Sequence, residues 1–181
     1  MTKMHKIYIL CSKHQTMSGG RKELKLFLIK EEISEETIEH PEVFTVDAMM
    51  EHLKDLNGVV GKNLFLKDKK KQLWLLTTIH DREIDLKVIA KKVQAAGGLR
   101  FADESILQEK LGVSQGCVTP LALFNDKAGD VKLILDSGFF NGEHVRCYFH
   151  PMVNSASMGI LPDDLLKFVK ATGHEAILID I

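Results

Sequence analysis

The segment FHPMVNSASMGI, residues 149–160, says more about this chain than any other stretch of its sequence. It begins at the end of Val145–Phe149, a run with the composition of a β-strand, and His150 and Pro151 follow directly. Pro151 ends the strand because proline has no N–H to donate to a neighbouring strand. An asparagine, two serines and a glycine come next, with no charged residue among them. Such a strand end predicts a site where backbone and small polar side chains surround a neutral ligand rich in hydroxyl groups.

Two more segments have similar residues at strand boundaries. Residues 116–120, GCVTP, form a Gly-x-x-Thr-Pro turn that enters an apolar run, Val118–Phe124, which we predict to be a strand. In residues 62–66, KNLFL, a lysine opens another predicted strand. The three segments together strengthen the prediction of a ligand site.

Together with residues 40–46, HPEVFTV, these segments resemble the YbaK/ProX family of aminoacyl-tRNA editing domains, and within it the free-standing prolyl-tRNA synthetase associated domain. The resemblance runs from about Glu39 to the C-terminus and includes KDKKK at 67–71, HDR at 80–82, LRFAD at 99–103 and TGH at 172–174. Several ordered motifs over most of a chain are more specific than one short pattern. Residues 1–30 match the family poorly.

The resemblance implies a fold and an activity. The fold is of the α+β class: a curved mixed β-sheet flanked by helices, with a pocket between the sheet and the helices. The activity is that of a trans-editing hydrolase, which deacylates mischarged tRNA by cleaving the 3′ aminoacyl ester. Alanyl-tRNA for proline is the expected substrate, since a pocket sized for proline rejects smaller amino acids by only ~1–3 kcal/mol per missing methylene. The expected partner is the aminoacylated 3′ end and acceptor stem of tRNA, with prolyl-tRNA synthetase as a further candidate.

The family motifs also imply site residues. The expected catalytic residues are Lys62, Gly116 and His150, the expected substrate-binding residues are Asn63, Thr119, Asn154, Ser155 and Ser157, and the expected tRNA-binding residues are Lys67, Lys69, Lys70 and Lys71. The commoner family form has threonines at some of the last three substrate-binding positions. Serine keeps the hydroxyl group and lacks the methyl group, which indicates a slightly larger pocket.

Each of these residues also has an interpretation without a function. Lys62 could be an edge lysine in water, Gly116 could satisfy the backbone of a turn, and His150 could be a structural histidine. The asparagine and serines of the 154–157 segment could be turn caps. The lysine run 67–71 could be a solvated turn or an attraction site for the phosphates of an acceptor stem, and both interpretations stay open.

Composition narrows the class of protein. The chain has 181 residues, of which 45% are hydrophobic and 27% charged, and its formal net charge is −1. These values are typical of a globular protein with a sizeable core, and the small net charge argues against nucleic-acid binding through charge alone.

The apolar run Ile7–Cys11 is too short for a membrane span or a signal segment. Three widely spaced cysteines, Cys11, Cys117 and Cys147, indicate a reducing compartment, and we expect a cytoplasmic protein.

The sequence lacks the common motifs for metals and cofactors. No Cys-x-x-Cys or His-x-x-x-His pair has zinc-ligand spacing, and there is no glycine-rich loop for phosphates or dinucleotides. We therefore expect no metal and no cofactor. Cys117 is the one candidate nucleophile, and a buried, unreactive cysteine is the alternative.

Apolar periodicity predicts interspersed helices and strands within one domain, residues 1–181. The predicted helices span residues 22–32, 45–56, 85–96, 103–111 and 162–171. The predicted strands span residues 35–40, 59–67, 72–79, 99–102, 118–124, 131–136, 145–149 and 175–181. A turn is expected at 125–129 and a looser loop at 137–143.

Two other functions stay open at this point. A module of the same fold could bind tRNA or a synthetase without hydrolysis, and a deacylation assay separates it from an editing enzyme. A small-molecule hydrolase could cleave an ester or thioester in the same pocket, and its activity would not depend on the acceptor stem.

Overall fold

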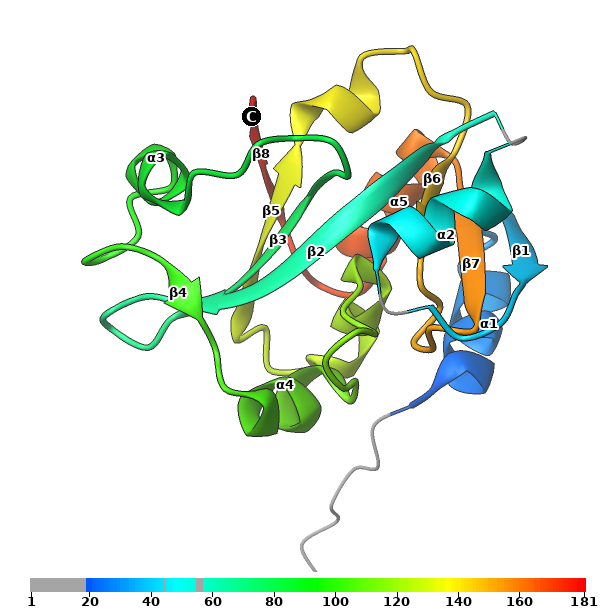
Figure 1. Ribbon diagram of the computed structural model, residues 1–181. Helices are drawn as coiled ribbons and strands as arrows, with labels where there is room; N and C mark the ends of the chain where they lie inside the picture. The colour runs from blue at the N-terminus through cyan, green and yellow to red at the C-terminus, as the bar shows by residue number, and fades with distance from the viewer. Residues whose placement is uncertain (1–18, 44, 55–56) are drawn as a thin grey trace, which may run out of the picture.

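The computed structural model describes residues 19–43, 45–54 and 57–181, and Figure 1 shows how their elements are arranged. The strands are β1 (Glu35–Glu39), β2 (Val59–Lys67), β3 (Leu73–Ile79), β4 (Arg100–Phe101), β5 (Val131–Asp136), β6 (Cys147–Phe149), β7 (Ala156–Ile160) and β8 (Ala176–Ile179). The helices are α1 (Arg21–Lys30), α2 (Val46–Leu53), α3 (Leu86–Lys92), α4 (Glu104–Leu111) and α5 (Pro162–Ala171), with short 3-10 helices η1 (Pro120–Asn125) and η2 (Ser137–Phe140).

All the strands in the described part of the chain join one mixed sheet. Its order is β1-β7-β6-β2-β3-β5-β8, and β4 pairs with β2 beside this path. The β1–β7, β7–β6, β2–β3 and β2–β4 pairs are antiparallel, whereas β6–β2, β3–β5 and β5–β8 are parallel. Parallel neighbours need long crossover connections, which helices commonly provide. The predicted fold class, a mixed sheet flanked by helices, is confirmed.

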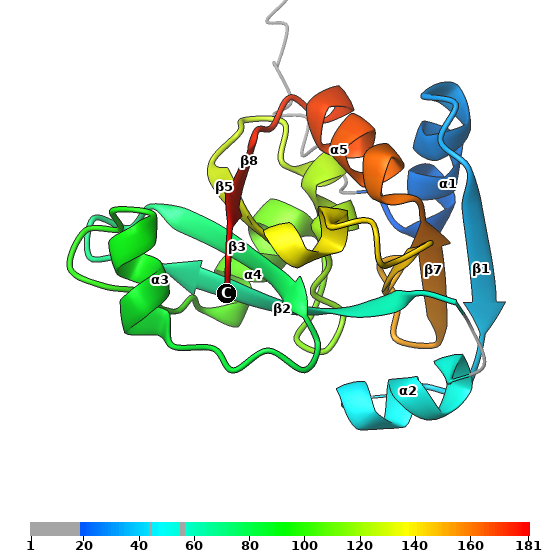
Figure 2. The same cartoon turned by 90° about the horizontal axis from the view of Figure 1, so that it is seen from above.

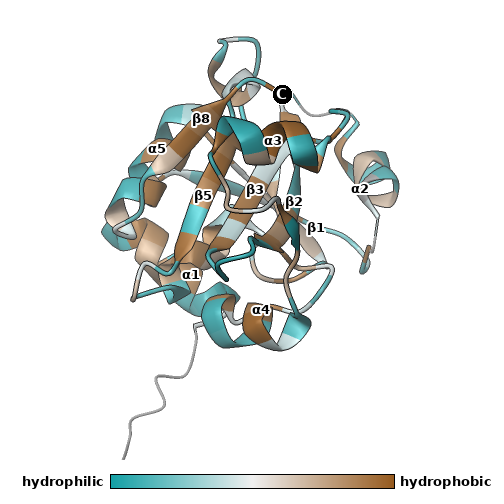
Figure 3. Ribbon diagram, turned by 90° about the vertical axis from the view of Figure 1, so that its left-hand side faces the viewer, coloured by the Kyte–Doolittle hydropathy of each residue, from teal (hydrophilic) through white to brown (hydrophobic). Residues whose placement is uncertain are grey.

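Helices cover both faces of this sheet. Figure 2 shows α2 on the opposite side of β1 and β7 from α1 and α5. Leu24 of α1 and Phe168 of α5 belong to the largest apolar core, whereas Met49 of α2 clusters with Val60 of β2. Ile89 of α3 packs in a separate cluster with residues of β3 and β5. In Figure 3, hydrophobic residues gather along β5 and β8, while α3 and α4 each have a hydrophilic side.

β2 pairs with β6 through its first two residues, Val59 and Val60, and with β3 from Gly61 onward, so Gly61 lies where the second pairing begins. A Cβ atom at Gly61 would lie 2.2 Å from the ring of Phe149, which is closer than any real contact. Glycine at this position therefore lets the Phe149 ring press against the β2 backbone, one residue before Lys62.

The predicted strand 118–124 is wrong, because most of this segment forms the 3-10 helix η1. The Thr119 hydroxyl caps this helix and accepts a hydrogen bond from the Leu121 N–H at 3.2 Å. Pro120 lies in the first turn, where N–H groups have no partner within the helix, so the N–H that proline lacks is not needed. Residues 120–124 are all buried. A run that is apolar on every side has no periodicity, so the sequence could not distinguish a strand from a buried helical turn.

A strand is also missing from the prediction. β7 follows the Pro151 turn and lies between β1 and β6, where the sequence predicted only a polar strand end. All its residues, Ser157 and Gly159 included, are buried. Because small and polar residues stand at inward positions here, the alternation that reveals a half-buried strand is absent.

Smaller differences concern the ends of elements. The helix predicted over 85–96 ends at Lys92, the strand predicted over 145–149 begins at Cys147, and the loop 137–143 contains η2. Leu56, Cys11 and the run Ile7–Cys11 lie outside the described residues. Within the part of the chain that the structure describes, no helix has both the length and the apolar content to cross a bilayer.

Candidate functional site

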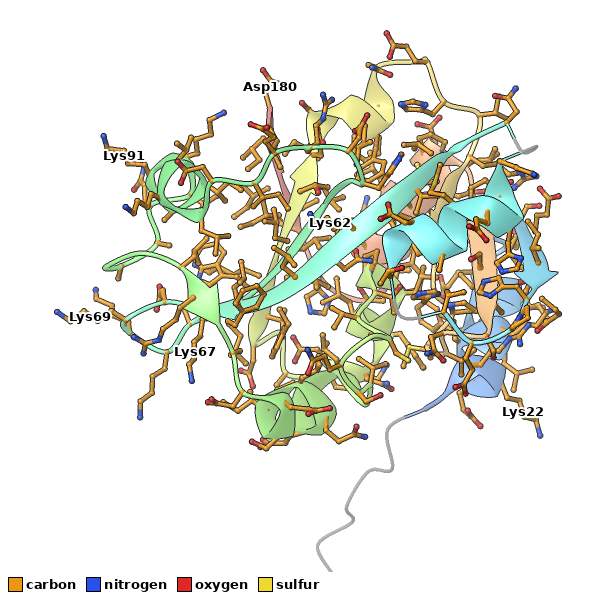
Figure 4. All side chains as sticks on the ribbon, viewed as in Figure 1. Lys22, Lys62, Lys67, Lys69, Lys91 and Asp180 are labelled. Atoms are coloured by element: carbon orange, nitrogen blue, oxygen red, sulfur yellow. The ribbon has the colours of Figure 1, made fainter. Side chains whose placement is uncertain are left out.

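A cavity of about 410 Å³ lies against β2. It brings together residues that are far apart in the sequence: Lys62 and Asn63 of β2, Gly116 of the loop before η1, and His150 directly after β6. Figure 4 shows that Lys62 lies along β2 and not at either end of the strand. Pockets for small ligands measure roughly 300–1,000 Å³. Residues from all three segments singled out in the sequence thus converge on one cavity of suitable size.

β2 contributes two polar side chains to this cavity. Lys62, expected to open the strand, is its fourth residue and is half-buried. Across residues 19–43, 45–54 and 57–181, no carboxylate forms an ion pair with Lys62, so its ammonium group can meet an anionic or polar ligand. The Asn63 Oδ1 atom accepts a hydrogen bond from the Thr77 hydroxyl at 2.8 Å. The amide NH₂ group of Asn63 is then the part that can donate to a ligand.

His150 contributes an uncharged imidazole. Its Nδ1 atom lies 3.0 Å from the Ala156 carbonyl oxygen and donates to it, which makes Nε2 the free acceptor of the neutral ring. Burial lowers the pKa of His150 below its ordinary value of 6.5, and repulsion from nearby His40 lowers it further, although the bond to Ala156 acts in the opposite direction. The ring is therefore neutral at pH 7 and can accept a hydrogen bond from a hydroxyl group or a water molecule.

Gly116 lies in a loop that is tied to α4. Its φ angle is +90°, a conformation that residues with a side chain rarely adopt. The neighbouring Gln115 N–H donates to the Glu104 carboxylate at 3.2 Å, which holds the loop beside the cavity. No described residue accepts a hydrogen bond from the Gly116 N–H. This loop can therefore offer a backbone donor to a ligand without a side chain in the way.

The remaining predicted substrate-binding residues do not line the cavity. Thr119 is fully buried and caps η1. The Asn154 and Ser155 carbonyl oxygens accept hydrogen bonds from Val43 N–H and His40 N–H at 3.0 and 3.1 Å. The Ser157 hydroxyl is fully buried and lies 2.9 Å from His40 Nε2. Asn154, Ser155 and Ser157 thus hold the loop after β1 in place, and Thr119 holds the start of η1, so any effect that these four residues have on a ligand is indirect.

The predicted tRNA-binding lysines lie toward the other end of β2. Lys67 forms an ion pair with Asp103, and the hydrogen bond between them lowers the pKa of the Asp103 carboxyl. Lys69, Lys70 and Lys71 are exposed in the turn between β2 and β3. Lys67 lies five residue steps along the strand from Lys62, about 17 Å at a rise of ~3.3 Å per residue. Figure 4 shows Lys67 and Lys69 well away from Lys62.

Sequence reasoning missed several residues of the cavity. Their side chains come from α2, β2, β4, α4 and the two loops beside them: Thr45, Met49, Phe65, Phe101, Glu104, Leu107, Gln115 and Val118. Most of them are apolar or small and stand in ordinary amphipathic patterns. No signal in a single sequence distinguishes an apolar residue that faces a cavity from one that faces the core. The wall of the pocket is thus a product of the tertiary structure.

Within the described part of the chain, no cysteine lines the cavity. Cys147 is fully buried, and burial raises the pKa of its thiol to about 12. Cys117 is half-buried and is not among the residues that line the cavity. Among the described residues, no three histidine, cysteine or carboxylate side chains gather as a metal site would need.

Comparison with known proteins agrees with this geometry. The model of the aminoacyl-tRNA editing domain family matches residues 40–168. Prolyl-tRNA synthetase associated domain-containing protein 1 of Bos taurus is 57% identical over 150 residues, 82% of this chain and 87% of the relative. The prolyl-tRNA editing protein ProX of Acetoanaerobium sticklandii is 34% identical over 146 residues, 80% of this chain and 87% of the relative.

A solved structure supports the fold independently. A crystal structure described as a candidate trans-editing enzyme for prolyl-tRNA synthetase superposes with a TM-score of 0.68 at 17% identity, covering 89% of this chain and 96% of its own. At that identity the likeness concerns the fold alone. The family model spans the segments that form the cavity wall, from the loop after β1 to α5. The chain belongs to the family of aminoacyl-tRNA editing domains.

Proposed function

We propose that this protein is an aminoacyl-tRNA deacylase that removes alanine from alanyl-tRNA for proline. The observation that supports this most is the convergence of Lys62, Asn63, Gly116 and His150 on one cavity. This set provides a cation, amide and backbone donors, and a neutral acceptor. An ester flanked by a ribose hydroxyl and a phosphate needs these groups and few others.

Each residue has a role that its environment permits. The Lys62 ammonium group holds a phosphate or ribose oxygen of the terminal nucleotide, and the Asn63 amide donates beside it. The Gly116 N–H donates to the ester carbonyl oxygen, where negative charge develops as water attacks. The His150 Nε2 atom accepts a hydrogen bond from a substrate hydroxyl or from the attacking water.

The reaction needs one water molecule and no covalent enzyme intermediate. Water adds to the ester carbonyl carbon, the bond from that carbon to the ribose oxygen breaks, and the ribose oxygen takes up a proton. The neighbouring ribose hydroxyl can position the water. The products are free alanine and tRNA with an intact 3′ end.

We propose that the cavity selects against proline by size. Its apolar wall includes Met49, Leu107 and Val118, and Gly116 also lines it. A wall rejects a larger group through overlap, whereas a synthetase pocket built for proline loses only ~1–3 kcal/mol per missing methylene when it meets alanine. A second, smaller pocket provides the discrimination that the first cannot.

One experiment tests the proposal directly. The protein is incubated with alanyl-, prolyl-, seryl- and cysteinyl-tRNA, and release of each amino acid is followed over time. We expect alanine to be released fastest and proline to stay bound to its tRNA. Binding of tRNA without release of any amino acid would indicate a non-catalytic module instead. Equal activity on a simple alanyl ester without tRNA would indicate a small-molecule hydrolase.

A further inference from the structure

Phe101 is an aromatic residue at the edge of the cavity and belongs to none of the apolar clusters that the described residues form. It lines the cavity, yet 64% of its surface is exposed. An exposed apolar residue is ordinary by itself. This one is unusual because it belongs to the wall of the site that also includes Lys62 and Gly116.

The backbone around Phe101 is held on both sides. β4 pairs with β2 in antiparallel register, Phe101 opposite Leu66 and Arg100 opposite Lys67. The Ala102 N–H donates to the Phe65 carbonyl oxygen at 3.1 Å. The next residue, Asp103, forms the ion pair with Lys67 and precedes α4. The ring is therefore attached to a fixed segment, and a ligand that stacks on it would lose little free energy in ordering the protein.

The charge beside Phe101 indicates which kind of ligand fits. Lys62 lines the same cavity as Phe101 and forms no ion pair with a described carboxylate. Arg100, the next residue of β4, is exposed and adds a second positive charge to the segment, although neighbouring strand residues point to opposite faces. An aromatic ring next to cations is the combination that proteins use for single-stranded nucleic acids, since bases stack on the ring and phosphates meet the charges. An apolar peptide would gain nothing from the cations.

We propose that the Phe101 ring stacks on a base of the single-stranded 3′ end of tRNA, either the terminal adenine or the base before it. This inference rests on the proposed function, because the ester must lie deeper in the cavity, between Lys62 and Gly116. The nucleotide attached to that ester then leaves the cavity past Phe101. Stacking is insensitive to the attached amino acid, so Phe101 contributes to binding of every tRNA end and not to the choice of amino acid.

The test measures binding of uncharged oligonucleotides that end in CCA, so that it does not depend on hydrolysis. Titrations compare the wild type with Phe101→Ala, with Phe101→Trp, which keeps a stacking surface, and with Ile29→Ala. Ile29 is a matched control, because it is 67% exposed but lies on α1 outside the cavity. We expect Phe101→Ala to raise the Kd about five- to hundred-fold, the usual range for one base–aromatic stack. Phe101→Trp and Ile29→Ala should stay within about threefold of the wild type.

Oligonucleotides with one base removed identify the stacked base. If the terminal adenine is the partner, removing it should abolish the difference between wild type and Phe101→Ala; if the preceding base is the partner, only its removal should do so. A Phe101→Ala effect of the same size on every abasic oligonucleotide, or no effect on the intact one, would overturn the inference. These outcomes are independent of catalysis: a wild type that binds the oligonucleotide through Phe101 but releases no alanine refutes the proposed function alone.

Discussion

The Thr77 hydroxyl lies 2.8 Å from the Oδ1 atom of Asn63, directly across the β2–β3 pair. Thr77 is fully buried, whereas Asn63 reaches the cavity. Thr77, a core residue, therefore determines which group of the Asn63 amide faces the cavity. Because the hydroxyl donates to Oδ1, the NH₂ group is directed to the ligand.

Thr77→Val should slow deacylation without unfolding the protein. Valine keeps the shape of threonine but cannot donate, so the Asn63 amide loses the bond that orients it. A bond of this kind contributes ~0.5–1.5 kcal/mol, and we expect kcat/KM to fall about three- to tenfold. Thr78→Val is the matched control, since Thr78 is equally buried but donates to the Ile79 carbonyl oxygen. Similar melting temperatures with equal kcat/KM losses for the two variants would contradict the positioning role.

Lys62→Ala should abolish most deacylation while the fold persists. Lys62 is half-buried at the cavity and has no carboxylate partner among the described residues, so its removal leaves no unpaired charge behind. Loss of the cation that anchors the terminal nucleotide misplaces the ester, and a misplacement of about 1 Å costs roughly 10²-fold in rate. Single-turnover release of alanine, with thermal unfolding of the same samples, measures both effects. Lys22→Ala on α1 (Figure 4) is the control, and near-wild-type turnover of Lys62→Ala would refute the proposed site.

His150 should make the protein less stable as the pH falls. Its pKa is lowered from 6.5 in the folded state, mainly by burial, so the unfolded chain binds a proton at a higher pH than the folded chain does. Protonation then favours the unfolded state, and the free energy of unfolding decreases as the pH falls below about 6.5 toward the folded-state pKa. Urea unfolding at pH 7.5 and at pH 5.5 measures this loss. The loss should be smaller in His150→Asn, and an identical loss in both proteins would show that His150 is not the group responsible.

Replacing Lys69, Lys70 and Lys71 by glutamine together should weaken tRNA binding and reduce its salt dependence. These side chains are exposed and extend from the turn beyond β2. Each phosphate contact contributes a slope of about −0.7 to −0.9 in log K against log salt. The single-turnover rate at saturating protein should change little, because the turn is remote from Lys62. If the triple variant showed the same salt dependence of tRNA binding as the wild type, residues 67–71 would be a solvated turn without a role in tRNA binding.

His150→Ala should admit some prolyl-tRNA, even though it also slows the alanine reaction. His150 is part of the cavity wall, and truncating it enlarges the space beside the aminoacyl group. A pocket that selects by size excludes larger groups more sharply than smaller ones, so trimming the wall relaxes the exclusion of proline. The ratio of alanine to proline release in competition measures this change. Equal cleavage of both substrates by the wild type would already refute selection by size.

Much of the architecture follows from local sequence. In the segment 162–171, proline begins helix α5, and Leu165 and Phe168 form its buried face. Gly173, with a φ of +81°, follows the last turn and ends the helix. Alternating or β-branched runs likewise predicted β2, β3 and β5, because their side-chain period is a property of the strand itself. The motifs around Lys62, Gly116 and His150 were sufficient to indicate the family and three parts of the site.

Only the tertiary structure decided how these parts meet. β7 is buried on all sides, so its polar Ser157 and its glycine resembled a loop, and η1 is uniformly apolar, so it resembled a strand. The contacts that hold the loop after β1 join residues that are distant in sequence: Ser157 lies 117 residues from His40. The role proposed for Phe101 depends on where β4 pairs with β2, which no local pattern encodes. Hydrophobic periodicity predicts which side chains face the interior of the protein. Whether such a side chain lies in the packed core or lines a cavity depends on the segments that pack against it, and these are distant in the sequence.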